Sequence, residues 1–187
     1  MTNTKKRPDI RGMVYIALFA VLMAVCSWIS IPAAVPFTLQ TFAVFAATGL
    51  LGGKRGTLAI CLYILLGMVG IPVFAEFSGG PGCILGPTGG YIVGFALSAA
   101  VVWAVTAKWG RRTATLILGM GLGLAVCYAF GTAWFIAVYA RQSGAIGWGT
   151  ALTWCVVPFI LPDCAKIALA IFVTKRLEKF MVKELRE

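Results

Sequence analysis

Residues 13–31 decide the fold class of this chain, and they read MVYIALFAVLMAVCSWISI. This run of 19 residues contains no charged side chain. A helix needs roughly 20 apolar residues to cross the hydrocarbon core of a bilayer. The run is also longer than the roughly 7–15-residue core of a cleaved signal peptide, so we interpret it as a first membrane helix.

The rest of the chain continues this pattern. Of its 187 residues, 60% are hydrophobic and 12% are charged, whereas a soluble domain usually has about 25% charged residues. Glycine, proline or charged residues interrupt the apolar runs, and the predicted helices cover residues 11–30, 37–51, 56–70, 89–107, 113–139 and a last segment reaching about residue 176. We predict an all-α integral membrane protein, a single membrane domain over residues 1–187 that forms a compact bundle of six transmembrane helices.

The basic residues predict the orientation of this bundle. The chain has 16 Lys and Arg and a net charge of +10. Fourteen of them fall in four clusters, at residues 5–11, 54–55, 108–112 and 175–186, which share one side if six helices cross the membrane. The positive-inside rule then places both termini in the cytoplasm, with residues 1–10 as a basic tail and residues 71–88 and 140–160 as extracellular loops. Because no basic face is interleaved with aromatic residues, we expect no nucleic acid partner.

Two ionisable residues interrupt the last apolar run, Asp163 and Lys166. A charged side chain at membrane depth is costly and usually faces a cavity or a partner. At about 1.5 Å per helical residue, Asp163 lies about 18 Å above the inner boundary, in layers that overlap those of Gln40, Tyr63 and Tyr91. The sequence therefore predicts a pocket that opens outward.

A second interpretation needs no ligand. Asp163 and Lys166 are three residues apart on one helical face, where they can pair with each other. Pro162 suits the first turn of a helix, and an Asp is favoured there by the helix dipole. The two interpretations are compatible, because a paired site can still open to a ligand.

The sequence offers no set of catalytic residues. It has no His, no nucleophile with a neighbouring base, and no phosphate loop, since residues 51–57 (LGGKRGT) have the residue types but not the spacing. The cysteines form no C-x-x-C pair, and we interpret them as small buried hydrophobic residues: Cys26, Cys61, Cys83, Cys127, Cys155 and Cys164. We expect a binding protein without a metal or a cofactor, unable to hydrolyse ATP on its own.

Four segments carry a resemblance to a known family. Residues 86–95 (GPTGGYIVGF) resemble the BioY family, the biotin-specific S components of energy-coupling factor (ECF) transporters. Residues 36–42 (PFTLQTF), 63–74 (YILLGMVGIPVF) and 158–166 (PFILPDCAK) resemble the same family in the same order. Together these segments extend from the second predicted helix to the last one.

The resemblance implies a function and a site. It implies high-affinity capture of biotin at the bacterial cytoplasmic membrane and delivery by an ABC-type importer, whose other parts are a transmembrane coupling protein and two cytoplasmic ATPases. Asp163 would accept hydrogen bonds from the ureido group of biotin, and Lys166 would meet the carboxylate or hold Asp163 in place. The other expected site residues supply polar contacts, apolar contacts or close backbone approach: Gln40, Tyr63, Thr88, Tyr91, Phe37, Phe74, Phe77, Gly79, Gly80, Gly89 and Gly90.

The first predicted helix carries small residues at Ala17, Ala20 and Ala24. Small residues four apart let helices approach closely in lipid. The resemblance implies that they face the coupling protein, and packing inside the chain is the alternative.

Two other functions remain open. One is an S component for another vitamin, such as thiamine or riboflavin. The other is a secondary carrier that works alone, driven by an ion gradient.

Overall fold

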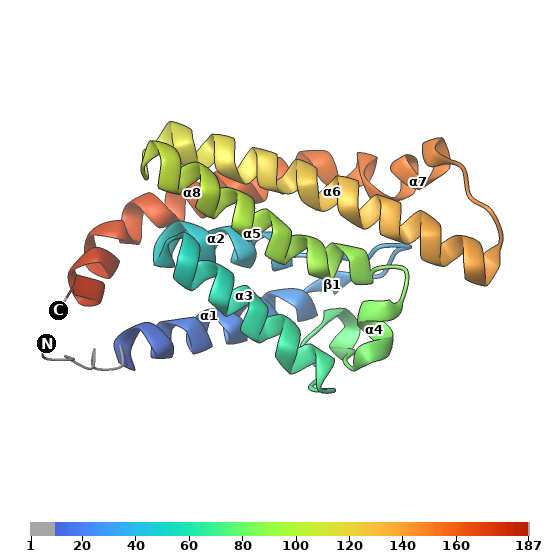
Figure 1. Ribbon diagram of the computed structural model, residues 1–187, viewed down its shortest axis with the longest axis horizontal. Coiled ribbons are helices and arrows are strands. Elements are labelled where there is room, and N and C mark those ends of the chain that lie inside the picture. Colours follow the sequence, from blue (N-terminus) through green and yellow to red (C-terminus); the bar gives the residue numbers. More distant parts are fainter. Residues whose placement is uncertain (1–9, 187) are drawn as a thin grey trace, which may run out of the picture.

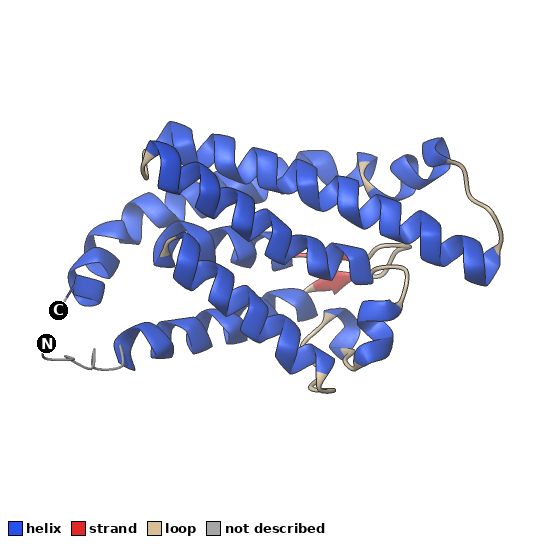
Figure 2. Cartoon of the chain, in the orientation of Figure 1, coloured by secondary structure: helices blue, strands red, loops and turns tan. Residues whose placement is uncertain are grey.

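The computed structural model describes residues 10–186, so residues 1–9 of the predicted basic tail lie outside the described part of the chain. The chain is helical almost throughout, as predicted (Figures 1 and 2). Its helices are α1 (Ile10–Trp28), α2 (Gln40–Leu51), α3 (Gly53–Met68), α4 (Pro81–Leu85), α5 (Gly89–Trp109), α6 (Thr113–Ser143), α7 (Trp148–Cys155) and α8 (Val157–Arg186), with a 3-10 turn η1 (Ala75–Phe77). Two-residue strands, β1 (Ser30–Ile31) and β2 (Phe37–Thr38), form one antiparallel pair between α1 and α2.

Helix α2 is the centre of the bundle. Every residue of α2 except Phe42 is buried, and α2 contacts α1, α3, α5 and α8. A helix that is apolar on all sides is expected in such an interior position. Its 12 residues extend only about 18 Å, less than the roughly 30 Å of a hydrocarbon core. Helix α2 begins at Gln40, and the β1–β2 segment comes directly before it in the chain.

Four segments are long and apolar enough to cross a membrane, namely residues 10–28, 89–109, 113–141 and 148–180. This confirms a multi-pass membrane protein. Helices α2 and α3 are shorter, so six membrane crossings stay a prediction.

The structure also differs from the predicted helix boundaries. Only Gly52, with a positive φ of 82°, separates α2 from α3, so α3 begins at Gly53 instead of Gly56. The segments predicted as loops 71–88 and 140–160 contain α4 and α7. These helices have 5 and 8 residues, too few for a helical pattern to stand out from flanking apolar sequence.

Figure 1 shows that the turns and the short helices collect at opposite ends of the bundle. The first turn of α1, the α2–α3 and α5–α6 turns and the end of α8 lie at one end. Helices α4 and α7 lie at the other end. Three of the four basic clusters fall within the described residues, and all three lie at the first of these ends.

The position of Pro162 corrects one expectation. Helix α8 begins at Val157 and continues through Pro162, so Asp163 does not lie in the first turn of a helix. Residue Val156 separates α7 from α8 with a non-helical φ of −124°. Because Pro162 lacks an N–H, it leaves one carbonyl of the preceding turn without its helical partner.

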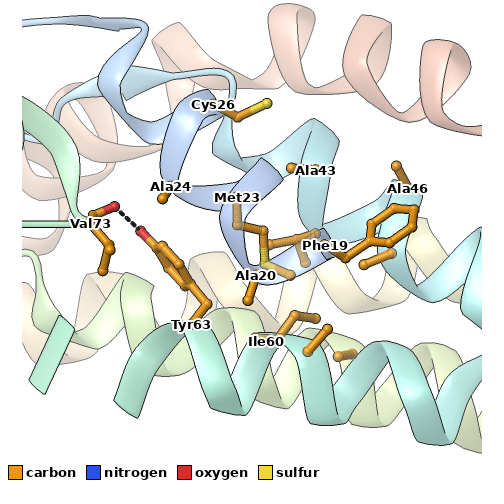
Figure 3. Packing of buried hydrophobic residues seen from close by; sticks show 14 of the residues in the cluster. Phe19, Ala20, Met23, Ala24, Cys26, Ala43, Ala46, Ile60, Tyr63 and Val73 are labelled. Atoms are coloured by element: carbon orange, nitrogen blue, oxygen red, sulfur yellow. Dashed lines mark hydrogen bonds between the residues drawn. The ribbon is translucent and has the colours of Figure 1, made fainter. Parts of the chain in front are cut away.

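Ala20 and Ala24 are also placed differently from the predicted docking surface. Their exposed fractions are 1% and 4%, and both belong to a buried cluster with Ile60 and Tyr63 of α3 (Figure 3). They serve packing inside the chain, which was the alternative interpretation. Ala17 alone of the three is exposed.

Candidate functional site

A cavity of about 300 Å³ lies among the segments at the α4 and α7 end of the bundle. Its volume is at the lower end of the roughly 300–1,000 Å³ that small-molecule pockets occupy. The wall comes from residues within 35–41, 74–78, 82–95, 124–128, 155–159 and 163–166. Segments that are distant in the sequence therefore build one site.

Asp163 is the anionic centre of the cavity wall. It is 3% exposed, and both of its carboxylate oxygens accept hydrogen bonds. The Tyr128 hydroxyl donates to Oδ2 at 2.6 Å, and the Lys166 ammonium donates to Oδ1 at 2.7 Å. Each carboxylate oxygen has about two acceptor sites, so each can accept one further hydrogen bond from a ligand.

Lys166 is held from two sides. Besides its ion pair with Asp163, its Nζ lies 4.2 Å from the centre of the Phe37 ring, a cation–π contact. The Phe37 ring in turn stacks on Phe159 at 5.7 Å. Lys166 is 6% exposed, so little of its charge reaches water.

A hydrogen-bond chain connects the start of α2 to the segment above the cavity. The Gln40 side-chain amide donates to the Tyr63 hydroxyl at 2.8 Å. Tyr63 donates to the Val73 carbonyl at 3.0 Å, as Figure 3 shows. The Ser27 hydroxyl donates to the same carbonyl at 2.5 Å. Gln40 is thus oriented by a tyrosine that is itself fully buried.

Tyr91 lies on the opposite wall. Its hydroxyl shares a hydrogen bond of 2.8 Å with Thr132, and its ring lies against Gly131 of α6. A Cβ at Gly131 would lie 2.3 Å from the Tyr91 ring. The absence of a side chain at Gly131 therefore allows α5 and α6 to bring the Tyr91 ring to the cavity.

Residues 71–88 cover the cavity and are anchored to three helices. Trp28 of α1 donates to the Pro72 carbonyl at 2.9 Å, and Trp134 of α6 donates to the Gly86 carbonyl at 3.0 Å. Tyr63 of α3 supplies the bond to Val73 described above. We name residues 71–88 the cover segment.

Six of the predicted site residues line the cavity: Gln40, Phe74, Thr88, Tyr91, Asp163 and Lys166. Tyr63 and Phe37 lie behind the wall, where they hold Gln40 and Lys166. Phe77, which was predicted as a ligand contact, does not line the cavity. Its ring is 63% exposed and stacks on Trp28 at 5.0 Å, away from the cavity.

The four predicted glycines do not line the cavity and serve close packing or turn geometry instead. A Cβ at Gly89 would lie 1.7 Å from the Ile84 carbonyl oxygen, and one at Gly90 would lie 2.3 Å from Trp134. A Cβ at Gly79 would lie 2.5 Å from the Ile71 carbonyl oxygen. Gly80 has a positive φ of 93°. Close packing at Gly79, Gly89 and Gly90 and the positive φ of Gly80 each give a structural reason for glycine at these positions.

Tyr128 and Glu76 line the cavity but were not predicted as site residues from the sequence. Tyr128 places a hydroxyl group in the middle of the long apolar helix α6, about 24 Å along the helix from Arg112. Its estimated depth in the membrane is similar to that of Tyr91, and this depth is the signal in the sequence that identifies Tyr128. Glu76 lines the cavity from η1, in a turn whose conformation no local pattern predicts.

Comparisons with known proteins agree with this architecture. Residues 1–183 match the BioY family. The protein named biotin transporter BioY from Thermotoga maritima is 38% identical over 179 residues, which cover 93% of this chain and 99% of that protein. The probable biotin transporter BioY from Pyrococcus horikoshii is 42% identical over 164 residues, covering 87% and 93% respectively.

A solved structure is similar over nearly the whole chain. It is described as the S-component for biotin from an ECF-type ABC transporter. Its TM-score is 0.81 at 28% identity, and the match covers 96% of this chain and 95% of that one. The arrangement of helices around the cavity is therefore shared with a protein of this description.

Proposed function

The chain belongs to the BioY family, and we propose that it is the S component of an ECF transporter, the subunit that captures biotin. It is a transport subunit and not an enzyme. The observation that carries this proposal is the buried carboxylate of Asp163 in the cavity wall, fixed by Tyr128 and Lys166.

The chemistry of biotin fits this carboxylate. The ureido ring offers two N–H donors and a carbonyl acceptor on a compact bicycle. The free acceptor sites of Asp163 suit the two donors, and a hydrogen bond to an ionised carboxylate is roughly twice as strong as a neutral one. Because Tyr128 and Lys166 hold both oxygens, Asp163 needs little reorganisation when the ligand arrives.

The remaining wall suits the rest of the molecule. Tyr91, Phe95 and Phe159 present aromatic surfaces to the apolar bicycle. The Gln40 amide and the Thr38 and Thr41 side chains supply polar contacts. Such a wall, mostly apolar with a few placed polar groups, is typical of small-molecule sites. The site needs no cofactor for this role.

Membrane orientation follows from the charges. We infer six crossings, with α2 and the β1–β2 segment together forming the second, and both termini in the cytoplasm of a bacterial cell. The basic clusters within the described residues lie at one end of the bundle, which supports this orientation. The cavity and the cover segment then face outward. Access of a protease to a C-terminal tag, in intact and in permeabilised cells, tests this orientation.

Transport needs partners that supply energy, because the chain has no phosphate-binding loop. We infer a transmembrane coupling protein and two cytoplasmic ATPases. Helix α1 offers the coupling protein an exposed apolar face, and one small residue lies within it: Val14, Ala17, Leu18, Val21 and Val25.

Biotin binding itself is the first test. Purified protein in detergent, titrated with labelled biotin, should bind one biotin per chain, and neither thiamine nor riboflavin should displace it. Calorimetry or a filter assay measures this. Absence of biotin binding, or displacement by either of the other vitamins, would reject the proposed function.

The docking face on α1 is tested by Ala17→Trp. Because Ala17 is exposed and lies outside the cavity, the variant should bind biotin as the unchanged protein does, but a bulky ring should prevent close helix contact with the coupling protein. Co-purification with the coupling protein and the ATPases measures assembly.

Leu122→Trp, at an exposed position of α6, is the matched control and should still assemble. Assembly of Ala17→Trp at the control level would exclude this face. Ala20→Trp is unsuitable here, because it would disrupt buried packing.

A further inference from the structure

The charges that line the cavity do not balance. Its wall contains two carboxylates, Glu76 and Asp163, and one ammonium, Lys166, which gives a net charge of −1. Biotin carries its own carboxylate at the end of a flexible chain. This inference rests on the proposed function, and it concerns how the cavity receives that end of the ligand.

Lys166 is not available to a ligand carboxylate. Its ammonium is 2.7 Å from Asp163 Oδ1 and 4.2 Å from the centre of the Phe37 ring, and the residue is 6% exposed. Moving it toward a ligand would break a buried ion pair and leave Asp163 with one partner fewer, which is strongly unfavourable. Among the described residues, 10–186, no other Lys or Arg lines the cavity.

Glu76 differs from Lys166 both in its contacts and in its exposure to solvent. Within residues 10–186, no hydrogen bond or ion pair engages its carboxylate, and the residue is exposed while it lines the cavity. Its charge therefore lies where the cavity meets the solvent. Asp163 is 3% exposed in the same wall, so a ligand whose head reaches Asp163 can reach the solvent with its chain on the side of Glu76.

The backbone fixes Glu76 in this position. Glu76 and Phe77 have positive φ angles of 58° and 54°, a conformation that costs free energy for residues other than glycine. Several contacts hold the turn, and two of them join it to more distant residues or close it from end to end. The Phe77 ring stacks on Trp28 at 5.0 Å, and the Phe74 N–H donates to the Ser78 carbonyl at 3.0 Å. Backbone strain of this kind is found preferentially at functional sites.

We propose that Glu76 sets a charge preference at the mouth of the cavity, so that biotin derivatives whose chain ends in a neutral amide or an ammonium bind more tightly than free biotin. A carboxylate next to Glu76 meets repulsion, and the one ammonium that lines the cavity within residues 10–186, that of Lys166, is already engaged by Asp163. An amide removes that repulsion, and an ammonium replaces it with attraction. The substrate class thus includes amides of biotin, such as those formed with amino groups of lysine.

Three ligands with the same head and different end charges test this. They are biotin (charge −1), biotinamide (0) and the amide of biotin with ethylenediamine (+1). For the purified full chain at low ionic strength, affinity should rise in this order, by about three- to tenfold across the series. Raising the salt concentration should shrink the differences, because the charges are exposed to solvent.

Variants assign the effect to one residue. Glu76→Gln should make biotin and the ethylenediamine amide bind within about twofold of each other, and the affinity for neutral biotinamide should change the least of the three. Glu76→Asp keeps the charge and should keep the order. Glu178→Gln, which removes a carboxylate near the end of α8 far from the cavity, should also keep the order.

Two results would overturn the inference. One is free biotin as the tightest of the three ligands, and the other is an unchanged order in Glu76→Gln. In both cases biotin still binds, so the proposed function stands. If none of the three ligands binds, the proposed function fails and this inference fails with it.

Discussion

Asp163→Asn lowers the affinity for biotin by roughly 30-fold to more than a thousandfold, the largest loss that we expect from one substitution. Removing the charge of a buried, hydrogen-bonded partner typically costs about 2–5 kcal/mol of binding free energy, and every 1.4 kcal/mol is tenfold in affinity. The asparagine amide also offers one acceptor oxygen where the carboxylate offers two. Calorimetric titration with biotin measures the loss.

The same variant is expected to lose stability, because it leaves the Lys166 ammonium buried without its counter-charge. Breaking a buried ion pair from one side costs about 3–5 kcal/mol. A loss of binding in Asp163→Asn alone could then reflect unfolding. The double variant Asp163→Leu with Lys166→Met removes both charges, and replacing a buried pair by apolar residues is often neutral for stability. It should melt near the temperature of the unchanged protein and still fail to bind biotin.

Tyr128→Phe provides a graded control. It removes the 2.6 Å hydrogen bond to Asp163 but keeps the carboxylate and its pair with Lys166. A hydrogen bond to a charged group contributes about 1.5–3 kcal/mol, so affinity should fall by at most about ten- to a hundredfold, less than in Asp163→Asn. If the double variant binds biotin at the original affinity, Asp163 does not belong to the site.

Gly89→Ala has the second largest expected effect. The new Cβ would lie 1.7 Å from the carbonyl oxygen of Ile84, which is backbone and cannot move aside as a side chain can. Either α4 or the start of α5 must shift, and both carry cavity residues, Cys83 on α4 and Tyr91 on α5. Overpacking typically costs about 1–3 kcal/mol, which lowers the melting temperature by roughly 2–12 °C for a chain of this length. We expect biotin affinity to fall at least about tenfold.

Gly82→Ala is the matched control for this prediction. Gly82 lies on α4 and lines the cavity, but no atom lies within 4 Å of a Cβ added there. Its effect on stability should stay within about 0.5 kcal/mol. Thermal unfolding and biotin titration of the two variants measure the contrast. Equal behaviour of the two would show that the contact between α4 and α5 does not shape the site.

The sequence predicts the helices well where their ends have a local cause. Glycine or charged residues end α2, α3 and α5 within three residues of the predicted positions. The start of α2 was predicted three residues too early, at Phe37 instead of Gln40. Phe37 and Thr38 look compatible with a helix in the sequence, but they pair with Ile31 and Ser30 as a short strand. A strand pair of two residues on each side is too short to be recognised in the sequence, because its formation depends on the partner strand.

The direction in which a helix residue points is harder to predict in this class of protein. In a soluble helix the polar face marks the solvent side, but lipid and core are both apolar, so α1 has no such marker. Ala17 and Ala20 are alike in the sequence, yet Ala17 is exposed and Ala20 is 1% exposed.

The sequence by itself determined the membrane class and the charge asymmetry, and it offered the pairing of Asp163 with Lys166 as one of two interpretations. These follow from composition and from a spacing of three residues on one helix, which are local properties. Only the tertiary structure decided that Tyr128 completes the acid site from 35 residues away and that Glu76 faces the cavity. Such contacts arise from how separate helices pack and how a strained turn is held, and no local pattern of residues encodes them.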